Sequence, residues 1–149
     1  AGAQLVASCD LAISSKEARF ATPGVNIGLF CSTPMVALSR NLSNKHAMQM
    51  LLTGDLIDAQ NAYRMGLVNE VVDAEQLESK TMELARKLAS KSPLTVAIGK
   101  EAYYRQAELP LSEAYDYTKE VMVRNLEARD AQEGISAFIE KRHPVWCGK

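Results

Sequence analysis

The sequence predicts an α/β fold, in which a few short strands near the N-terminus are followed by an almost entirely helical second half. Apolar and polar residues alternate over 10–14, and 18–22 has the composition of a neighbouring strand. Beyond residue 73, apolar residues recur instead at three- and four-residue intervals, which is typical of one face of a helix. We therefore expect one domain with two regions, residues 1–73 and residues 74–149.

Capping residues and turn residues set the order of elements in the first region. Pro23-Gly24 ends a strand and opens a loop. Ser32 is predicted to cap a helix with Pro34 in its first turn, and Asn44 to cap the next. The full predicted order is helix 4–8, strands 10–14 and 18–22, helices from Ser32 and from Asn44 to Thr53-Gly54, helix 58–66 with an Asp58 cap, and strand 67–72.

The second region is predicted to be helical throughout. A long helix capped by Asp73 extends to Ser90, and its apolar face consists of Leu77, Thr81, Leu84, Ala85 and Leu88. Pro93 and Pro110 each mark a further helix. The last helix spans roughly 131–141, with Ile135, Phe138 and Ile139 apolar, and Pro144 follows it.

Composition excludes several classes of partner and site. Apolar residues make up 47% and charged residues 23%, which is ordinary for a globular protein. A net charge of −1 gives no reason to expect a nucleic acid or an anionic membrane as partner. No apolar run approaches the roughly 20 residues of a membrane span. The three cysteines form no CxxC pair, so we expect a reducing compartment and no metal site.

Several short segments, in this order and spacing, resemble the enoyl-CoA hydratase/isomerase (crotonase) superfamily. They are Ala1-Gly2-Ala3, Cys9-Asp10, Pro23-Gly24, Leu52-Thr-Gly-Asp55, Ala59-Gln60 with Ala62, Gly66-Leu67-Val68 and the run from Glu133 to Arg142. The resemblance implies a ClpP/crotonase-like fold, of which this chain is the C-terminal half: the end of a ββα core and a helical trimerisation region. A segment preceding Ala1 is expected, and without it residues 1–149 should be insoluble or molten.

The resemblance places an oxyanion hole at the start of the chain. The main-chain N–H of Ala1 matches the family's donor to the thioester oxygen of an acyl-CoA. Small residues there let a substrate approach the backbone, and a helix start supplies free N–H groups and a positive dipole end. Tight helix–sheet packing would also explain small residues at these positions.

Gln4 and Gly24 occupy the positions of the family's two glutamates. Hydration requires a carboxylate that activates water and an acid that delivers a proton, and an amide cannot accept a proton near neutral pH. We therefore expect weak or absent hydration, with Gln4→Glu plus Gly24→Glu raising it. Gln4 could instead be a polar residue satisfied by neighbours, and Gly24 could leave room for a water or small anion.

Other residues could replace the missing acids or bind the cofactor portion of a substrate. Cys31, Ser32 and Thr33 include candidate nucleophiles, although the two histidines, His46 and His143, are distant in sequence and Cys31 suits packing as well. The resemblance implies that Phe138 lines an acyl pocket and that Lys141 reaches a CoA phosphate, with both residues on one helix face. An ordinary amphipathic helix would carry the same residues.

The sequence therefore predicts an acyl-CoA-binding member of this superfamily that polarises a thioester. No cofactor is expected to be permanently bound; a coenzyme A thioester is the substrate or ligand. The resemblance implies a homotrimer or hexamer in a bacterial cytoplasm or mitochondrial matrix. Two rivals stay open: an active enzyme of another reaction, such as isomerisation or thioester hydrolysis, and a non-catalytic assembly subunit.

Overall fold

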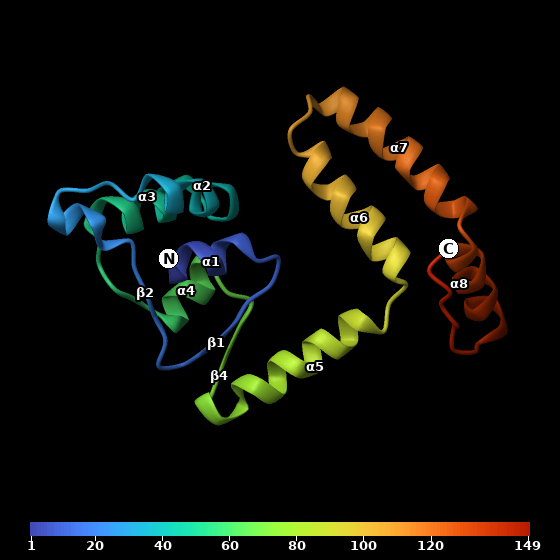
Figure 1. Cartoon of the computed structure of the whole chain (residues 1–149), viewed down its shortest axis with the longest axis horizontal. Helices are drawn as coiled ribbons and strands as arrows, with labels where there is room; N and C mark the ends of the chain where they lie inside the picture. The colour runs from blue at the N-terminus through green and yellow to red at the C-terminus, as the bar shows by residue number, and fades with distance from the viewer. The chain divides into compact units, whose positions relative to one another are not determined.

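Helices and very short strands are interspersed in the first of two units, Ala1–Glu83, while the second unit, Leu84–Lys149, contains helices but no strand (Figure 1). The computed structural model describes all of residues 1–149. The boundary between the units falls inside helix α5, Leu77–Ala89. This order of elements agrees with the predicted change from mixed to helical structure.

The first unit contains four α-helices, four strands and two 3₁₀ turns before α5. In chain order they are α1 (Gly2–Ser8), β1 (Ile13–Ser15), β2 (Arg19–Phe20), η1 (Pro23–Ile27), α2 (Ser32–Asn41), α3 (Asn44–Thr53), β3 (Ile57–Asp58), α4 (Ala59–Met65), β4 (Glu70–Val72) and η2 (Ala74–Gln76). The strands are shorter than the sequence pattern predicted.

Strand pairing differs from the prediction that 10–14 and 18–22 lie beside each other. β1 pairs with β4 in parallel, with Ile13 opposite Glu70, and β2 pairs with β3 antiparallel, with Phe20 opposite Ile57. Both early strands thus pair with later segments. Asn69 extends the first pairing, because its side-chain oxygen accepts a 2.8 Å hydrogen bond from the N–H of Ala12.

Three of the predicted helix ends are confirmed. The carboxylate of Asp58 accepts the N–H of Asn61 at 2.7 Å and so caps α4. Gly54 and Gly66 end α3 and α4 in the left-handed conformation, with φ of 65° and 85°. Glycine suits these two positions because a side chain would strain a positive φ.

Three predicted caps are wrong. Ser43 rather than Asn44 caps α3 through the N–H of His46. Ser32 is already inside α2, and its hydroxyl donates to the carbonyl of Phe30 at 3.3 Å. Asp73 precedes η2 without capping it, because its carboxylate binds Lys16 Nζ at 2.6 Å.

One apolar core holds the first unit together. Its buried members come from the four helices α1 to α4, from Leu42 just after α2, and from the segment after α4: Ala7, Leu38, Leu42, Ala47, Met50, Leu51, Ala62, Leu67 and Val68. Other apolar side chains of the unit are exposed, including Leu5 at 67% and Leu11 at 41%. The predicted helix over 73–90 forms as α5, but none of its residues is buried.

The second unit packs its helices through small side chains. α6 (Pro93–Gln106) and α7 (Leu111–Glu127) lie side by side, and α8 (Arg129–Glu140) contacts both (Figure 1). The Ser92 hydroxyl caps α6 by accepting the N–H of Thr95. The buried apolar residues of these helices are Ala102, Ala114, Val121 and Ala137.

Residues 142–149, near the end of the chain, form a C-terminal strap held by two carboxylates of α8. Asp130, only 1% exposed, accepts hydrogen bonds from the Ser92 hydroxyl at 2.6 Å and the N–H of Cys147 at 2.7 Å. Glu133 accepts two bonds from Arg142, at 2.6 and 2.8 Å, and one from the N–H of Val145. No pattern in the sequence predicts this strap.

These bonds make the strap sensitive to acid. The Ser92 hydroxyl and then the Cys147 N–H lower the pKa of Asp130 to about 2, and Arg142 with the Val145 N–H lowers the pKa of Glu133 to about 2. Unfolded carboxyls titrate near pH 4. A carboxyl whose pKa is lower in the folded state stabilises that state while it is ionised, at a pH above about 4. This stabilisation is lost as the carboxyls are protonated between about pH 4 and about pH 2.

We expect the strap to detach in that pH window. Trp146 reports on it because it is the one tryptophan of residues 1–149 and its indole N–H donates to the carbonyl of Ser90 at 2.9 Å. Its fluorescence, identified with Trp146→Phe, should change between pH 4 and 2. Asp130→Asn should produce the same change at neutral pH, whereas Asp116→Asn, in an exposed pair with Lys119, should not. An unchanged Asp130→Asn spectrum would contradict this account.

Candidate functional site

Helix α1 presents two of the predicted site residues in its first turn. Ala1 is the N-cap, and no side chain hydrogen-bonds to the free N–H groups of this turn. The Ala1 carbonyl accepts the N–H of Leu5 at 3.0 Å, so the first helical bond is formed. The remaining N–H groups at the start of a helix have no intrahelical acceptor. The backbone here can therefore donate to a ligand oxygen.

Gln4 is half-buried in the first turn of α1. Its main-chain carbonyl accepts the hydroxyl of Ser8 at 2.8 Å, while its side-chain amide forms no hydrogen bond within the chain. The amide is thus not held by neighbouring residues, in contrast to the alternative in which neighbours satisfy it. An unpaired amide can orient a ligand or a water but cannot act as a base.

Gly24 lies in η1, where the loop folds back on itself. The carbonyl of Gly24 accepts the N–H of Leu29 at 2.9 Å. A Cβ atom at Gly24 would lie 2.5 Å from the carbonyl oxygen of Leu29 and 2.8 Å from Cys31 Sγ. Neither approach is tolerable, so the loop in this form admits no side chain at position 24. The predicted space for a water or anion on that side is filled.

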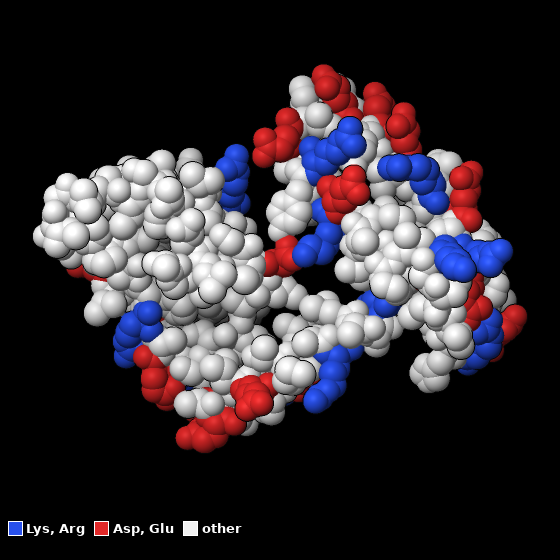
Figure 2. Space-filling model, in the orientation of Figure 1, with Lys and Arg blue, Asp and Glu red and all other residues white.

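An uncharged, partly apolar surface surrounds Gly24. Residues 20–39 contain no Lys, Arg, Asp or Glu. Within this segment Ile27 is 77% exposed, Leu29 63% and Phe30 43%. Figure 2 shows a broad area without formal charge over the α2 and α3 region of the first unit. Exposed apolar side chains that gather in one place are typical of binding surfaces.

Two side chains fix the elements that carry the site, and the sequence pattern did not single them out. Asn41, at the end of α2, donates its amide N–H groups to the carbonyls of Ala7 at 2.8 Å and Ala37 at 2.9 Å. Thr22, just before η1, is 2% exposed and donates its hydroxyl to the carbonyl of Met50 at 2.8 Å. Only the fold brings these donors to their acceptors, since Ala7 and Asn41 are 34 residues apart.

The candidate nucleophiles are not paired with a base. Cys31 is half-buried beside Gly24, and the Ser32 hydroxyl is occupied by the carbonyl of Phe30. Neither histidine side chain hydrogen-bonds to Cys31, Ser32 or Thr33. No group of three His, Cys, Asp or Glu side chains in residues 1–149 is arranged to hold a metal ion.

Phe138 and Lys141 belong to the second unit, whereas Ala1, Gln4 and Gly24 belong to the first. Phe138 is 85% exposed on α8. The helix predicted over roughly 131–141 forms as α8, but it ends at Glu140, and Lys141 adopts left-handed angles of 57° and 37° as the residue that follows it. The two residues therefore do not share one helix face. Lys141 is exposed and forms no ion pair within the chain.

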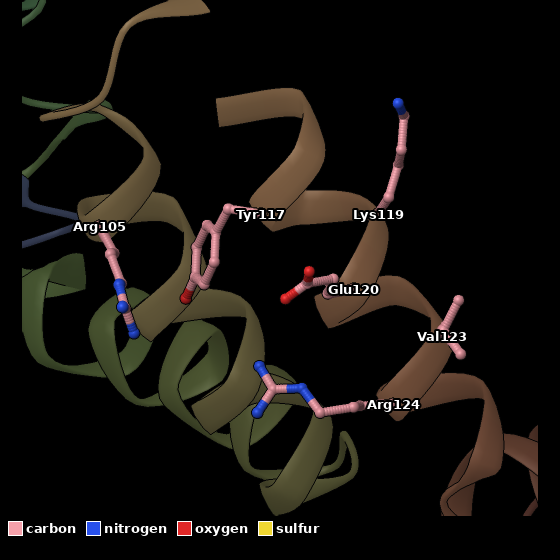
Figure 3. A pocket seen from close by; sticks show the side chains of 6 residues that line it. All are labelled: Arg105, Tyr117, Lys119, Glu120, Val123 and Arg124. Carbon is pink, nitrogen blue, oxygen red and sulfur yellow. The ribbon is translucent and has the colours of Figure 1, made fainter. Parts of the chain in front are cut away.

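The second unit also contains grooves. One of about 650 Å³, between α6 and α7, is lined by Arg105, Tyr117, Lys119, Glu120, Val123 and Arg124 (Figure 3). Its Arg105 guanidinium carbon lies 4.8 Å from the centre of the Tyr117 ring, a cation–π contact. Another, of about 580 Å³, includes Phe138 and Trp146 in its lining. Phe138 is the one predicted site residue that lines either groove.

None of the helices combines the length and hydropathy that a membrane crossing requires.

Comparison with known proteins identifies the family. The family model described as "Enoyl-CoA hydratase/isomerase" matches residues 1–149. The chain is 55% identical to "Enoyl-CoA hydratase domain-containing protein 3, mitochondrial" of Rattus norvegicus over 146 residues, which are 98% of this chain and 49% of that protein. The chain spans about half the length of the curated relatives it matches.

Solved structures confirm the fold. The crystal structure of human enoyl-CoA hydratase domain-containing protein 3 has a TM-score of 0.93 and 53% identity, over 97% of this chain and 57% of that one. An enoyl-CoA hydratase from Mycobacterium smegmatis has a TM-score of 0.94 and 47% identity, over 97% and 56%. The predicted crotonase fold is confirmed, and the chain covers somewhat more than half of each of these two structures. The chain belongs to the enoyl-CoA hydratase/isomerase family.

Proposed function

We propose that this chain carries part of an acyl-CoA thioester site and that the protein hydrates enoyl-CoA weakly or not at all. The thioester oxygen accepts a hydrogen bond from the main-chain N–H of Ala1. Family membership supports the binding part of this proposal, since the donor is a backbone group that side-chain substitutions leave in place. The relatives' printed names supply the substrate class, an enoyl-CoA.

The main observation in support of weak or absent hydration is the path of the backbone around Gly24. Leu29 O and Cys31 Sγ occupy the space that a side chain at position 24 would enter. The carboxylate that the family resemblance places here is therefore excluded by the path of the loop, in addition to being absent from the sequence. At the position of the family's other glutamate stands Gln4, whose side chain has the same size but carries an amide instead of a carboxylate. Without either group, water has no base and the enolate has no positioned acid.

What remains at the site can still stabilise charge. A backbone donor aimed at a developing oxyanion contributes about 3–4 kcal/mol in well-studied sites. The exposed apolar side chains of Ile27, Leu29 and Phe30 suit an acyl chain better than a charged group. The site therefore fits thioester recognition and enolate stabilisation rather than addition of water.

A second candidate is an enzyme that uses this donor for another enolate reaction, such as isomerisation or thioester hydrolysis. The unpaired side-chain amide of Gln4 favours it, because a free amide can position a water or the acyl group. The alternative to an enzyme is a non-catalytic assembly subunit, which would keep the fold but would not turn over a substrate. Turnover of a panel of acyl-CoA thioesters, measured against pH, separates the two, because a true catalytic group gives a titrating rate.

We further propose a cellular location and an oligomeric state from the family relationship. The rat relative is named as mitochondrial and a solved relative comes from Mycobacterium smegmatis, so a mitochondrial matrix or a bacterial cytoplasm fits. Assembly as a homotrimer or a pair of trimers would cover apolar side chains that α8 leaves exposed, such as Phe138 and Ile139 at 85% and 72%.

Acyl-CoA binding should survive and depend on Lys141. Calorimetry with the complete gene product should detect butyryl-CoA at micromolar concentrations. Lys141→Ala should weaken binding about two- to fivefold at low salt and less at high salt, because an exposed ammonium–phosphate contact is screened. Lys87→Ala, which removes another exposed lysine, serves as the control. Absence of binding at high micromolar butyryl-CoA would refute the proposed function.

A further inference from the structure

Asn41 connects helix α2 with helix α1, whose first turn contains Ala1 and Gln4 of the proposed thioester site. It is the last residue of α2, and its Nδ2 atom donates to the carbonyl oxygens of Ala7 in α1 and Ala37 in α2, at 2.8 and 2.9 Å. Both N–H groups of the amide are therefore used. The first of these bonds is the one that crosses from one helix to the other.

The acceptor in α1 is a carbonyl that the helix itself leaves free. Ala7 lies in the last turn, where carbonyls have no intrahelical donor. The N–H of Cys9, just after the helix, donates to the carbonyls of Leu5 and Val6 and not to that of Ala7. Ala7 is 3% exposed and belongs to the core that also contains Leu38 of α2. Asn41 thus adds a directional bond to a contact that is otherwise apolar.

A seven-residue helix depends on such contacts for its direction. α1 has about two turns and a length of about 10 Å, and helices this short are not stable alone. Since the helix is rigid over that length, a bond that fixes its last turn also fixes where its first turn points. The first turn contains Ala1 and Gln4.

We propose that Asn41 is a positioning residue for the thioester: it holds α1 so that the main-chain N–H of Ala1 meets the substrate carbonyl. This inference rests on the proposed function. Without the amide, Ala7 loses its donor and the first turn can tilt about the apolar contact. A displacement of an ångström at a reacting group is enough to lose most of an oriented hydrogen bond.

The test compares two ligands that differ only at the carbonyl. Butyryl-CoA has the thioester oxygen, and S-butyl-CoA is a thioether of the same length without it. The complete wild-type protein should bind butyryl-CoA about tenfold more tightly, the value of one good hydrogen bond. Asn41→Ala should reduce this preference at least about threefold and leave the affinity for S-butyl-CoA within about twofold.

Two further variants keep the result interpretable. Asn41→Asp has the same shape but no N–H to donate, so it should lose the same preference. Asn61→Ala, an exposed asparagine of α4 whose side chain makes no hydrogen bond, is the matched control and should behave as wild type. Asn41 is itself exposed, so its replacement by alanine opens no cavity, and circular dichroism melting checks that each variant is folded.

The outcomes separate the two proposals. A wild-type protein that binds both ligands equally overturns the proposed function, and the role of Asn41 with it. A wild-type preference that persists in Asn41→Ala overturns the positioning role alone. Equal weakening of both ligands also overturns it, because it would show that Asn41 supports the fold without directing the carbonyl donor.

Discussion

The complete gene product should hydrate crotonyl-CoA about 10⁴-fold or more slowly than an enoyl-CoA hydratase that retains both carboxylates. Each acid–base group supplies about 10²–10⁴ in rate, and Gln4 and Gly24 replace two such groups. The decline should appear in kcat, because the oxyanion donor that binds the thioester is a backbone group. The loss of absorbance of the enoyl thioester measures the rate directly. A rate within tenfold of the active hydratase would sink this prediction.

Restoring one carboxylate should recover part of the activity. Gln4→Glu places a carboxylate in the first turn of α1, where the side chain is half-buried and makes no hydrogen bond that the change would break. We expect hydration to rise about tenfold or more, with a rate that increases with pH as the carboxyl ionises. Gln49→Glu introduces the same charge on the exposed face of α3 and should leave the rate unchanged.

The second large effect concerns Gly24. Gly24→Glu should not add to the recovery given by Gln4→Glu, contrary to what the family resemblance alone implies, and it should destabilise the first unit. The added Cβ would lie 2.5 Å from the carbonyl oxygen of Leu29, a backbone atom that the Gly24–Leu29 hydrogen bond holds in place. Forcing extra atoms into a packed site costs about 1–3 kcal/mol, occasionally more.

A melting experiment checks this expectation. Gly24→Ala should already lower the melting temperature by several degrees, because the obstruction is met at Cβ. Gly99→Ala is the control: nothing lies within 4 Å of its added Cβ in α6, so it should be neutral or slightly stabilising. If Gly24→Ala melts like wild type, or if the double variant hydrates better than Gln4→Glu, the loop is not the obstacle described.

Local signals in the sequence predicted local structure well. Asp58, Gly54 and Gly66 were placed correctly because a cap or a left-handed turn depends on a few neighbouring atoms. Asp73 was misassigned for the opposite reason. Its carboxylate has a better partner in Lys16, 57 residues away, and no local pattern reveals that competition.

Strand pairing and site geometry required the fold. The alternation of apolar and polar residues over 10–14 could not predict that this strand pairs with β4. Such alternation shows which face of a strand is buried, but it does not show which other strand lies beside it. The sequence shows that residue 24 is a glycine. Only the structure shows that Leu29 O and Cys31 Sγ lie where its Cβ atom would be. The roles of Asn41 and Asp130 were missed because an amide at a helix end and an acid at a helix start look like ordinary surface residues.

A single NMR titration tests the central claim, that the thioester is bound but not hydrated. Crotonyl-CoA is mixed with the complete gene product, and the olefinic and methyl proton signals are followed over hours. We predict saturable shifts or broadening of the crotonyl signals, which report binding, with no 3-hydroxybutyryl-CoA signals above the uncatalysed level. Rapid appearance of the hydroxyacyl signals, or crotonyl signals that stay unperturbed at saturating protein, would contradict the account.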